Sequence, residues 1–316
     1  MRAVVYDAYG PPETLRVEEV ARPVPRGDEV LVKVHAVGVN ASDWETQVGT
    51  PLYARIGGLR RPRHRTLGSD IAGVVEAIGP AVTRVRVGEE VFGDNLERMG
   101  GFAEYVVARE KVLAPKHPGL SFAQAAALPQ SGVIALQGIR GPHPVGPGHR
   151  VLVNGAGGGT GALAIQLAKL DGAEVTGVDN TAKQEFMRTA GADHVIDYTR
   201  TDFTRLGERW DLVLDLSGHH GALAHRRALT PKGRYRWVGG SMNTMLQVLV
   251  GGALLGRQRI LVVRPNTADL LTMADLCASG TLTTHIERHY RLDEVPAALR
   301  HLGDGRALGK LVVTVA

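Results

Sequence analysis

A glycine-rich segment in the middle of the chain, residues 154–161, limits the possible folds more than any other feature. It follows an apolar stretch with strand character, Arg150–Asn154, and opens a stretch with helical character, 161–170. A second strand-like stretch ends at Asp179, about 20 residues further on, as in dinucleotide-binding units. Glycines let the backbone approach a pyrophosphate, and the start of a helix offers free N–H groups to it. The segment therefore predicts a βαβ unit whose first turn binds phosphate.

The rest of the chain shows two patterns. Short strand-like stretches with Gly and Pro turns fill the first part, and the last stretch, 309–315, returns to that pattern. Between them, strand-like and helical stretches alternate, which predicts a parallel sheet covered on both faces. A chain of 316 residues exceeds the usual size of one core. We predict an α/β protein with a barrel-like β domain at residues 1–120, completed by 285–316, and a doubly wound parallel-sheet domain at residues 121–284.

The charge of the chain does not favour a nucleic-acid binder. The formal net charge is +5 and the sequence pI about 9.5, but the basic residues are scattered. The one dense run, Arg60 to Arg65, contains Pro62 and falls in an expected loop, where charges are usually solvated. Nucleic acid is therefore not the expected partner.

Cysteine usage and hydropathy predict a cytoplasmic protein. Cys277 is the only cysteine, so no disulfide can form within the chain. The first residues, Met1–Tyr6, look like a strand and lack the apolar core and cleavage pattern of a signal peptide. The longest apolar run, 245–256, is too short to span a bilayer. We therefore expect no membrane partner.

Several motifs resemble those of quinone oxidoreductases, the zinc-free branch of the medium-chain dehydrogenase superfamily. The glycine-rich segment carries Gly155, Gly158 and Gly161 at the spaced small-residue positions of that family. The other motifs are residues 38–43, 67–75, 191–198 and 309–313, in the family's order along nearly the whole chain. The resemblance implies a GroES-like β-barrel domain interrupted by a Rossmann domain. It also implies an NAD(P)H-dependent oxidoreductase that forms a homodimer.

The positions that hold zinc in related alcohol dehydrogenases carry other residues in this chain. The first ligand position is Asn40, and Gly-Ser-Asp at 68–70 replaces the Gly-His-Glu signature. The lobe that holds a structural zinc with four cysteines is missing between residues 92 and 101. The sequence therefore predicts no metal site.

Without a metal to polarise a carbonyl, a conjugated acceptor is the easier substrate. A quinone or an α,β-unsaturated carbonyl (enone) takes hydride at carbon and holds the charge as an enolate, which needs hydrogen-bond donors near the oxygen. The candidate catalytic residues are Asn40, Tyr53 and Arg264. In the family, the Asn that matches Asn40 lies beside the nicotinamide. Plainer interpretations are a turn residue for Asn40, a packing residue for Tyr53, a loop charge for Arg264 and a helix cap for Asp43.

The cofactor-binding candidates lie in the glycine-rich segment, at Asn40 and after the later strands. They are Asn40, Gly155, Gly157, Gly158, Gly159, Thr160, Gly161, Asp179, Asn180, Lys183, Tyr198, Ser217, Gly218, Val238, Gly239 and Gly240. Asp179 would bind the adenosine ribose and repel a 2′-phosphate, which favours NADH. Lys183 would pair with that phosphate, and Tyr198 matches a family tyrosine at the adenosine end. The residues favour NADH and the resemblance NADPH, so both stay open, with a slight preference for NADPH.

Two further features bear on the activity and the assembly. Ile134 stands where the family often has a Thr that faces the nicotinamide, so one hydrogen bond is lost unless Gln130 or Ser131 supplies it.

We predict a quinone or enone reductase, in one version a pathway-specific tailoring reductase. The alternative is a non-catalytic protein that binds the cofactor, either crystallin-like or RNA-binding. The apolar stretch 260–263, expected at a sheet edge, predicts pairing of two copies in a homodimer.

Overall fold

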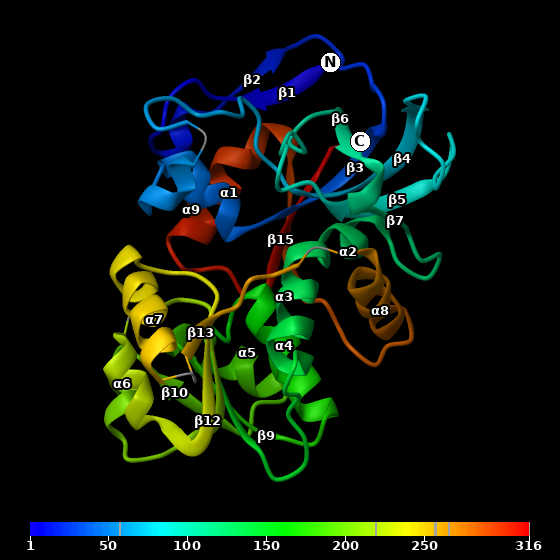
Figure 1. Ribbon diagram of the computed structural model, residues 1–316. Coiled ribbons are helices and arrows are strands. Elements are labelled where there is room, and N and C mark those ends of the chain that lie inside the picture. The colour runs from blue at the N-terminus through cyan, green and yellow to red at the C-terminus, as the bar shows by residue number, and fades with distance from the viewer. Residues whose placement is uncertain (57, 219, 256–257, 265, 316) are drawn as a thin grey trace. The chain divides into compact units, whose positions relative to one another are not determined.

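The structure, a computed structural model, describes residues 1–56, 58–218, 220–255, 258–264 and 266–315 (Figure 1). It divides into two compact units. The β unit comprises Met1–Gln130 with Pro265–Ala316, and the α/β unit comprises Ser131–Arg264. The α/β unit is shorter than the predicted 121–284. The difference arises because α2 (Phe122–Ala126) and α8 (Thr267–Ala278) pack against strands of the β unit.

A seven-stranded sheet forms the framework of the β unit. In spatial order its strands are β14 (Ile286–Arg291), β15 (Lys310–Thr314), β3 (Glu29–Val39), β4 (Asp70–Ile78), β5 (Glu90–Asp94) and β7 (Leu113–Pro115), with β6 (Tyr105–Arg109) paired to β3. A separate antiparallel pair, β1 (Arg2–Val5) and β2 (Arg16–Glu19), lies at the top of Figure 1. β15 from the end of the chain pairs with β3, so distant segments build one sheet.

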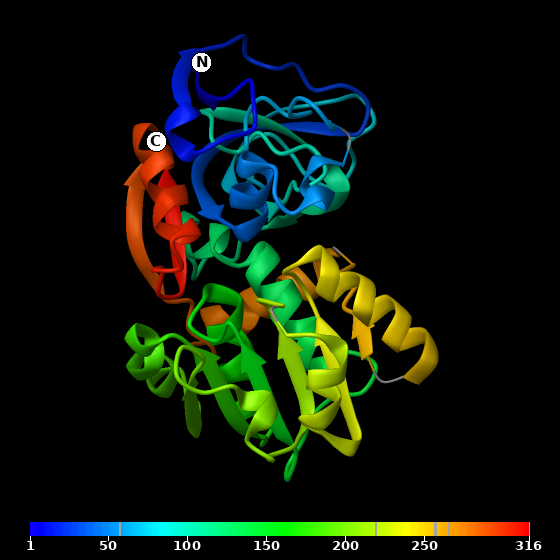
Figure 2. The same cartoon turned by 90° about the vertical axis from the view of Figure 1, so that its left-hand side faces the viewer.

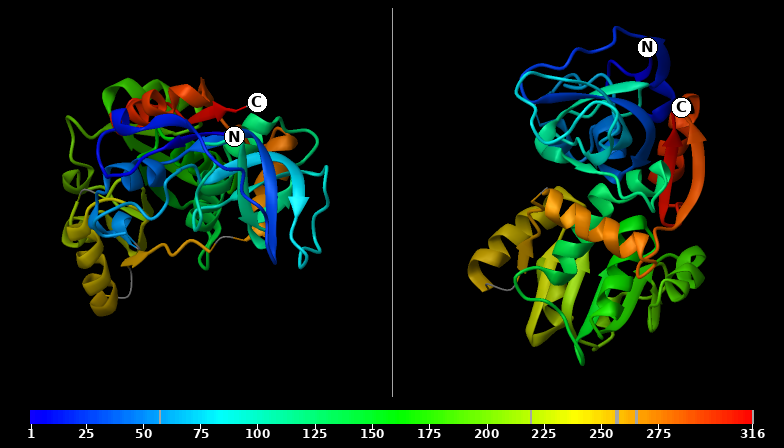
Figure 3. Two further views of the ribbon diagram at one scale, coloured as in Figure 1. Left: turned by 90° about the horizontal axis from the view of Figure 1, so that it is seen from above. Right: turned by 90° about the vertical axis from the view of Figure 1, so that its right-hand side faces the viewer.

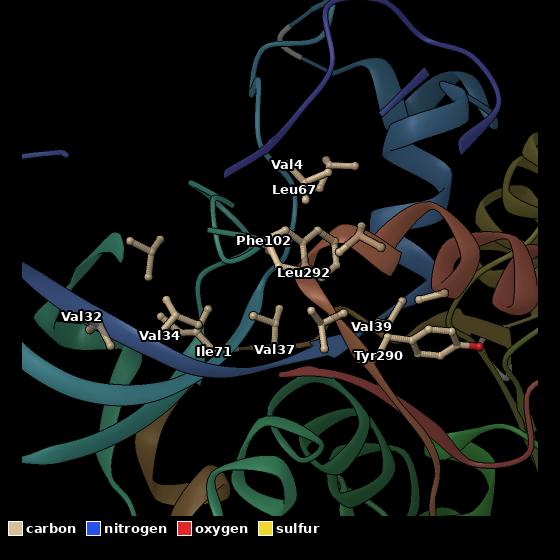
Figure 4. Packing of buried hydrophobic residues seen from close by; sticks show 14 of the residues in the cluster. Val4, Val32, Val34, Val37, Val39, Leu67, Ile71, Phe102, Tyr290 and Leu292 are labelled. Carbon is tan, nitrogen blue, oxygen red and sulfur yellow. The ribbon is translucent and has the colours of Figure 1, made fainter. Parts of the chain in front are cut away.

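The core of the β unit follows from the pattern of β3. Val32 and Val34 are buried, whereas Lys33 between them is exposed, as expected for successive side chains on opposite faces of a strand. Over these valines meet Leu67, Phe102 and Leu292, which come from loops and a short helix far apart in the sequence (Figure 4). The core therefore depends on the whole β unit and not on one hairpin.

Two helices from opposite ends of the chain pack together in the β unit. α1 (Ala41–Val48) lies next to α9 (Val295–Gly303), and a Cβ added at Gly303 would lie 2.5 Å from the ring of Trp44. Figure 2 shows β14 and α9, in orange and red, along one side of the β unit. The short 3-10 helices of this unit are η1 (Pro12–Thr14), η2 (Leu52–Arg55), η3 (Glu110–Val112) and η6 (Leu292–Glu294).

The α/β unit contains a six-stranded parallel sheet. In spatial order its strands are β10 (His194–Asp197), β9 (Glu174–Asp179), β8 (Arg150–Asn154), β11 (Trp210–Asp215), β12 (Leu229–Trp237) and β13 (Gln258–Ile260). Counted from β8, this order is 3-2-1-4-5-6, the order of doubly wound dinucleotide-binding sheets. The predicted fold class is therefore confirmed. The strand order reverses between β8 and β11, which is where such sheets bind ligands.

Helices precede or connect the strands of this sheet (Figure 3). They are α3 (Pro129–Arg140), α4 (Gly159–Leu170), α5 (Gln184–Thr189), α6 (Ala222–Arg227) and α7 (Met242–Leu255), with the 3-10 helices η4 (Thr181–Lys183) and η5 (Phe203–Arg205). α3 begins two residues before the α/β unit does. α7 contains most of the apolar run 245–256, whose last residue lies outside the described residues. Within the described ranges, no helix is long and apolar enough to cross a membrane.

One strand ends earlier than the sequence predicts, and the segment before another strand bonds outside the regular sheet. β13 ends at Ile260, not at residue 263, because Val262 N–H bonds the carbonyl of Ile260 and turns the chain. β6 begins only at Tyr105. The N–H groups of Gly101 and Phe102 instead bond the carbonyls of residues 68 and 67, outside the regular sheet.

Candidate functional site

The glycine-rich loop follows β8, and β9 holds it in place. The N–H groups of Gly155 and Ala156 both donate to the carbonyl of Val178, at 2.9 and 3.1 Å. Gly155 has a φ of +84°, a conformation that favours glycine. The first two residues of the turn after β8 are therefore held by backbone hydrogen bonds.

The loop leaves open space at the start of α4. Gly158 is the N-cap of α4 and has no side chain to bond the first N–H groups of the helix. A Cβ added at Gly158 would meet only Gly155 O, at 3.6 Å, whereas a Cβ at Gly161 would lie 2.4 Å from that same oxygen. Gly161 thus allows the helix to pack closely, and Gly158 keeps a cradle open. A pyrophosphate fits such a cradle, because the helix start supplies N–H donors and a positive dipole end.

The carboxyl ends of β8 and β11 are joined through one buried carboxylate. Asp215 Oδ1 accepts from Asn154 Nδ2 at 2.7 Å and from Gly218 N at 2.8 Å, and its Oδ2 accepts from Tyr235 Oη at 2.6 Å. Burial raises the pKa of Asp215, but the His225 side chain, whose Nε2 lies 3.3 Å from Oδ2, and the hydrogen bonds to the carboxylate outweigh burial and hold the pKa below its ordinary value. Asp215 is therefore an ionised anchor for the loops at the point where the strand order reverses.

The remaining candidates that follow β11 and β12 lie around the same anchor. Ser217 N donates to Asp215 Oδ1 at 3.2 Å, and Val238 N donates to the backbone carbonyl of Asp215 at 2.9 Å. Gly240, with a φ of +129°, lies so close to Gly218 that an added Cβ would be 2.7 Å from its Cα. The structure therefore brings these predicted cofactor residues together at the carboxyl edge of the sheet.

The acidic residue at the end of β9 is engaged inside the loop. Asp179 Oδ2 accepts from Gly157 N at 2.9 Å, and its Oδ1 accepts from Asn180 N at 2.9 Å. Lys183 Nζ is 3.6 Å from Asp179 Oδ1, and both residues are only 7% exposed. Tyr198 is 54% exposed, and its N–H donates to Asp179 O at 3.1 Å. Asp179 therefore holds the loop as well as carrying a charge, and Lys183 compensates that charge.

The β unit contains a second polar cluster, centred on Asn40 and Lys310. Lys310 Nζ donates to Asn40 Oδ1 at 2.6 Å and to Val39 O at 3.0 Å, and lies 3.9 Å from Asp70 Oδ2. Asn40 Nδ2 donates to Ser69 Oγ at 3.2 Å. Burial raises the pKa of Asp70 and lowers the pKa of Lys310, and their mutual attraction opposes both shifts. The cluster therefore contains a buried cation held by an amide, a carbonyl and a carboxylate.

Gln130 extends this cluster on its other side. Gln130 Nε2 donates to Ser69 Oγ at 2.7 Å, and Gln130 N donates to Asp70 Oδ2 at 3.1 Å. Ser42 Oγ, on α1, donates to Gln130 Oε1 at 3.1 Å. The side chains that form these bonds come from α1, β4 and the start of α3. The sequence alone did not predict that these three elements meet.

The donor set around Asn40 does not fit zinc. Asn40, Ser69 and Asp70 stand at the positions that the resemblance assigned to zinc ligands, and they present an amide, a hydroxyl and a carboxylate. The ammonium of Lys310 already lies among them, where a metal ion would repel it. In the part of the chain that the structure describes, no group of three or more His, Cys, Asp or Glu side chains is arranged to hold a metal ion.

The other two candidate catalytic residues have clear local positions. Tyr53 lies on η2 in the β unit, and its hydroxyl is 3.3 Å from Glu45 Oε1 on α1. Arg264 lies at the end of the α/β unit and is exposed. The backbone N–H and carbonyl of Arg264 bond the side chain of Gln137, at 3.0 and 2.9 Å.

The prediction for Asp43 as a helix cap is confirmed. Asp43 Oδ2 accepts from Asn40 N at 2.9 Å, which is the reciprocal bond of a capping box at the start of α1. Its Oδ1 accepts from Gly68 N at 2.9 Å. Asp43 therefore fixes the loop before β4 to the helix that follows Asn40.

Two family models match the chain. The model described as the alcohol dehydrogenase GroES-like domain matches residues 26–118, and the model described as zinc-binding dehydrogenase matches residues 190–313. With the doubly wound sheet and its phosphate cradle, these matches define a medium-chain dehydrogenase/reductase.

Individual relatives narrow the class. A 2-methylene-furan-3-one reductase of Solanum lycopersicum is 33% identical over 99% of this chain and 79% of its own length. A chloroplast envelope quinone oxidoreductase homolog of Arabidopsis thaliana is 30% identical over 99% of this chain and 98% of its own. The solved quinone oxidoreductase of Coxiella burnetii is 31% identical with a TM-score of 0.89, covering 100% of this chain and 99% of that one. The Escherichia coli quinone oxidoreductase, solved with NADPH, is 25% identical with a TM-score of 0.85, covering 99% and 100%. The chain therefore belongs to the quinone oxidoreductase branch of the superfamily.

Proposed function

We propose that this protein is an NAD(P)H-dependent reductase that transfers hydride to a quinone or an enone without zinc. One observation carries the proposal: the cradle at Gly158, which opens at the start of α4 beside the point where the strand order reverses. The names of the relatives, reductases of a methylene-furanone and of quinones, support the substrate class.

The proposed cofactor contacts come from the α/β unit. The backbone N–H groups of residues 159–161 would bind the pyrophosphate, and Lys183 and Tyr198 would bind the adenosine end. NADPH is the preferred cofactor, because Lys183 already compensates the charge of Asp179 and Asp179 is tied to Gly157 N. The NADPH complex of the Escherichia coli relative supports this choice. When bound, the nicotinamide supplies the hydride.

The proposed contacts to the substrate oxygen centre on Asn40. One N–H of its amide is engaged with Ser69 Oγ at 3.2 Å, and the other has only a long contact of 3.5 Å to Gly38 O. That second N–H is the candidate donor to a developing enolate. Lys310 holds the amide oxygen and so fixes which edge of the amide points away from the cluster. Tyr53 and Arg264 remain candidate donors.

Isotope transfer tests the proposed reaction. The protein is supplied with cofactor deuterated at the transferred position and with a test enone. We expect deuterium on the β-carbon of the product. Deuterium on a carbinol carbon, with the double bond intact, would show an alcohol dehydrogenase instead. A protein that oxidises no cofactor with any quinone or enone would favour a non-catalytic role.

Metal content tests the zinc-free part of the proposal. The purified protein is expected to contain far less than one zinc per chain, and a chelator is expected to leave its activity unchanged. Stoichiometric zinc with loss of activity on chelation would contradict this part and leave the hydride acceptor open.

We also propose a two-fold dimer in the cytoplasm. β13 is the last strand of the described sheet, and its outer edge is a natural place for pairing with a second copy. Sedimentation at micromolar concentration tests the dimer, and a monomer would contradict it. Imaging of the tagged protein in its own cells tests the location, since the relative from Arabidopsis thaliana is named for the chloroplast envelope.

A further inference from the structure

We infer that Glu45 is the proton donor of the reduction and that it acts through the hydroxyl of Tyr53. The inference rests on the proposed reductase function and assigns the group that completes it. Glu45 lies on α1 and Tyr53 on η2, and Tyr53 Oη is 3.3 Å from Glu45 Oε1. Both side chains are half-buried, so they meet at the surface of the β unit. The pair joins a carboxyl to a hydroxyl that can pass a proton on.

Glu45 shares a helix face with the polar cluster around Asn40. Ser42 precedes Glu45 by three residues on α1, so their side chains lie on one face. Ser42 Oγ donates to Gln130 Oε1 at 3.1 Å, and Gln130 Nε2 donates to Ser69 Oγ at 2.7 Å. Ser69 in turn accepts from Asn40. The carboxyl therefore lies on the same face of α1 as Ser42, which is joined through Gln130 and Ser69 to the proposed donor to the substrate oxygen.

Burial gives Glu45 the strength of acid that this task needs. Desolvation raises the pKa of Glu45 to about 7, although the hydrogen bond from Tyr53 lowers it. A general acid works best when its pKa lies near the pH at which the enzyme operates. Near neutral pH, a large fraction of Glu45 is therefore protonated and able to donate.

The charged groups on the neighbours of α1 are engaged with other partners. Arg55 of η2 donates to Gly49 O and lies over the ring of Tyr9. Arg300 of α9 pairs with Glu13 of η1. His301 of α9 pairs with Glu287 of β14. On α1 itself, the other carboxyl is Asp43. Burial and the Tyr53 contact therefore decide the protonation of Glu45.

Two other carboxyls of the cluster are poor proton donors. Burial also raises the pKa of Asp43 to about 7, but its side chain is fully buried and both oxygens accept from backbone N–H groups. Asp70 is fully buried, and its carboxylate accepts from Gln130 N. Neither carboxyl offers an accessible oxygen from which a proton can leave and to which solvent can return one.

The proton step balances with the hydride step. The β-carbon of the enone accepts the hydride, and the electron pair of the C=C bond moves to the carbonyl oxygen as an enolate. The O–H bond of Tyr53 breaks as its proton passes to that oxygen, and the O–H bond of Glu45 breaks as its proton passes to the Tyr53 oxygen. Solvent then reprotonates the Glu45 carboxylate. The enol that results rearranges in solvent to the saturated ketone. With a quinone, the same transfers give a keto tautomer of the hydroquinone, which rearranges in solvent to the hydroquinone.

Substitution of the acid tests the inference. Glu45→Gln keeps the shape and can still bond Tyr53, but it has no proton to give. We expect kcat for an enone with NADPH to fall about a hundredfold, with KM little changed.

The wild-type kcat should fall as the pH rises through about 7, because the acid must be protonated, and Glu45→Gln should lack this dependence. Glu45→Asp should keep it, and Tyr53→Phe should lower kcat like Glu45→Gln. The control is Glu97→Gln, an exposed carboxyl of the β unit, which should behave as wild type.

A measurement without cofactor or substrate accompanies the kinetics. The side-chain carboxyl carbon of Glu45 is followed by NMR in the 13C-labelled wild-type protein and assigned by through-bond correlations to its backbone. We expect it to titrate near pH 7. Titration near the ordinary pKa of Glu would overturn the inference, and this test stands even if a variant fails to fold.

The kinetic outcomes separate the inference from the proposed function. A wild-type protein that reduces enones, with a Glu45→Gln variant of equal kcat and equal pH profile, overturns the inference alone. A wild-type protein that reduces neither quinones nor enones overturns the proposed function and, with it, the role of Glu45.

Discussion

The two polar regions of this molecule are built from different parts of the chain. The cradle in the α/β unit is made of backbone: Gly155 and Ala156 bond Val178 O, and the missing side chain at Gly158 leaves its space. The cluster in the β unit is made of side chains, with Lys310 held among Asn40 and Asp70. A site made of backbone depends mainly on residues whose small size and φ angles allow the backbone to take its course. A side-chain cluster needs a balance of charges brought together from distant segments, so the two regions should fail in different ways.

The largest effect is expected in the cradle. Gly158→Val should weaken NADPH binding at least a thousandfold, which is about 4 kcal/mol, because the side chain occupies the space of the pyrophosphate. The fold should be retained, since an added Cβ would meet only Gly155 O at 3.6 Å. Fluorescence titration measures the affinity, and thermal unfolding measures the stability.

Gly161→Val is the matched control for that change. Its Cβ would lie 2.4 Å from Gly155 O, so here the loss should appear as a lower unfolding temperature. A folded Gly158→Val variant with unchanged affinity for NADPH would show that the cradle does not bind the cofactor.

The next effect concerns the buried cation of the β unit. Lys310→Met should lower the free energy of unfolding by about 3 kcal/mol, because Asp70 loses its compensating charge in a buried place. The double variant Lys310→Met with Asp70→Asn should recover part of the loss. Urea unfolding measures both. A single variant as stable as wild type would mean that the cluster does not depend on its charge balance, and the contrast with the cradle would disappear.

Asn40→Ala should act on turnover more than on stability. The N–H of Asn40 that makes the long 3.5 Å contact to Gly38 O is the proposed donor to the enolate, so kcat for an enone should fall about a hundredfold, or about 2.7 kcal/mol. Stopped-flow measurement of cofactor oxidation at saturating substrate gives this value, and thermal unfolding gives the accompanying loss of stability. A fall of only a fewfold would assign Asn40 to the capping of α1 and the support of Lys310.

The difference between the backbone cradle and the side-chain cluster explains how much could be predicted from the sequence. The cradle, β8 and the position of Asp179 follow from glycine spacing and strand patterns, which are local along the chain. The cluster could not be predicted in this way. Lys310 Nζ is 2.6 Å from Asn40 Oδ1, although 270 residues separate them along the chain. A pattern of residues along the sequence does not indicate a contact between such distant residues. Glu45 was missed because it reads as an ordinary exposed helix residue until burial and Tyr53 are known. β13 was misplaced because the apolar stretch continues beyond the turn at Val262.

The smallest expected effect concerns Asp179, whose side chain both bonds the backbone of the cradle and forms a charged side-chain pair. Asp179 accepts a backbone bond from Gly157 and also forms a buried ion pair with Lys183. Asp179→Ser should shift the ratio of affinities toward NADPH about tenfold, or about 1.4 kcal/mol, because it removes repulsion of the 2′-phosphate. Asp179→Asn should give the same shift with less loosening of the loop, since its amide oxygen can still accept from Gly157 N. Lys183→Met, which keeps most of the stem that packs on Gly157, should shift the ratio toward NADH. Fluorescence titration with both cofactors measures the ratios. If none of the three substitutions changes the ratio, the pair serves only to hold the loop, and the choice between NADPH and NADH is made by other residues.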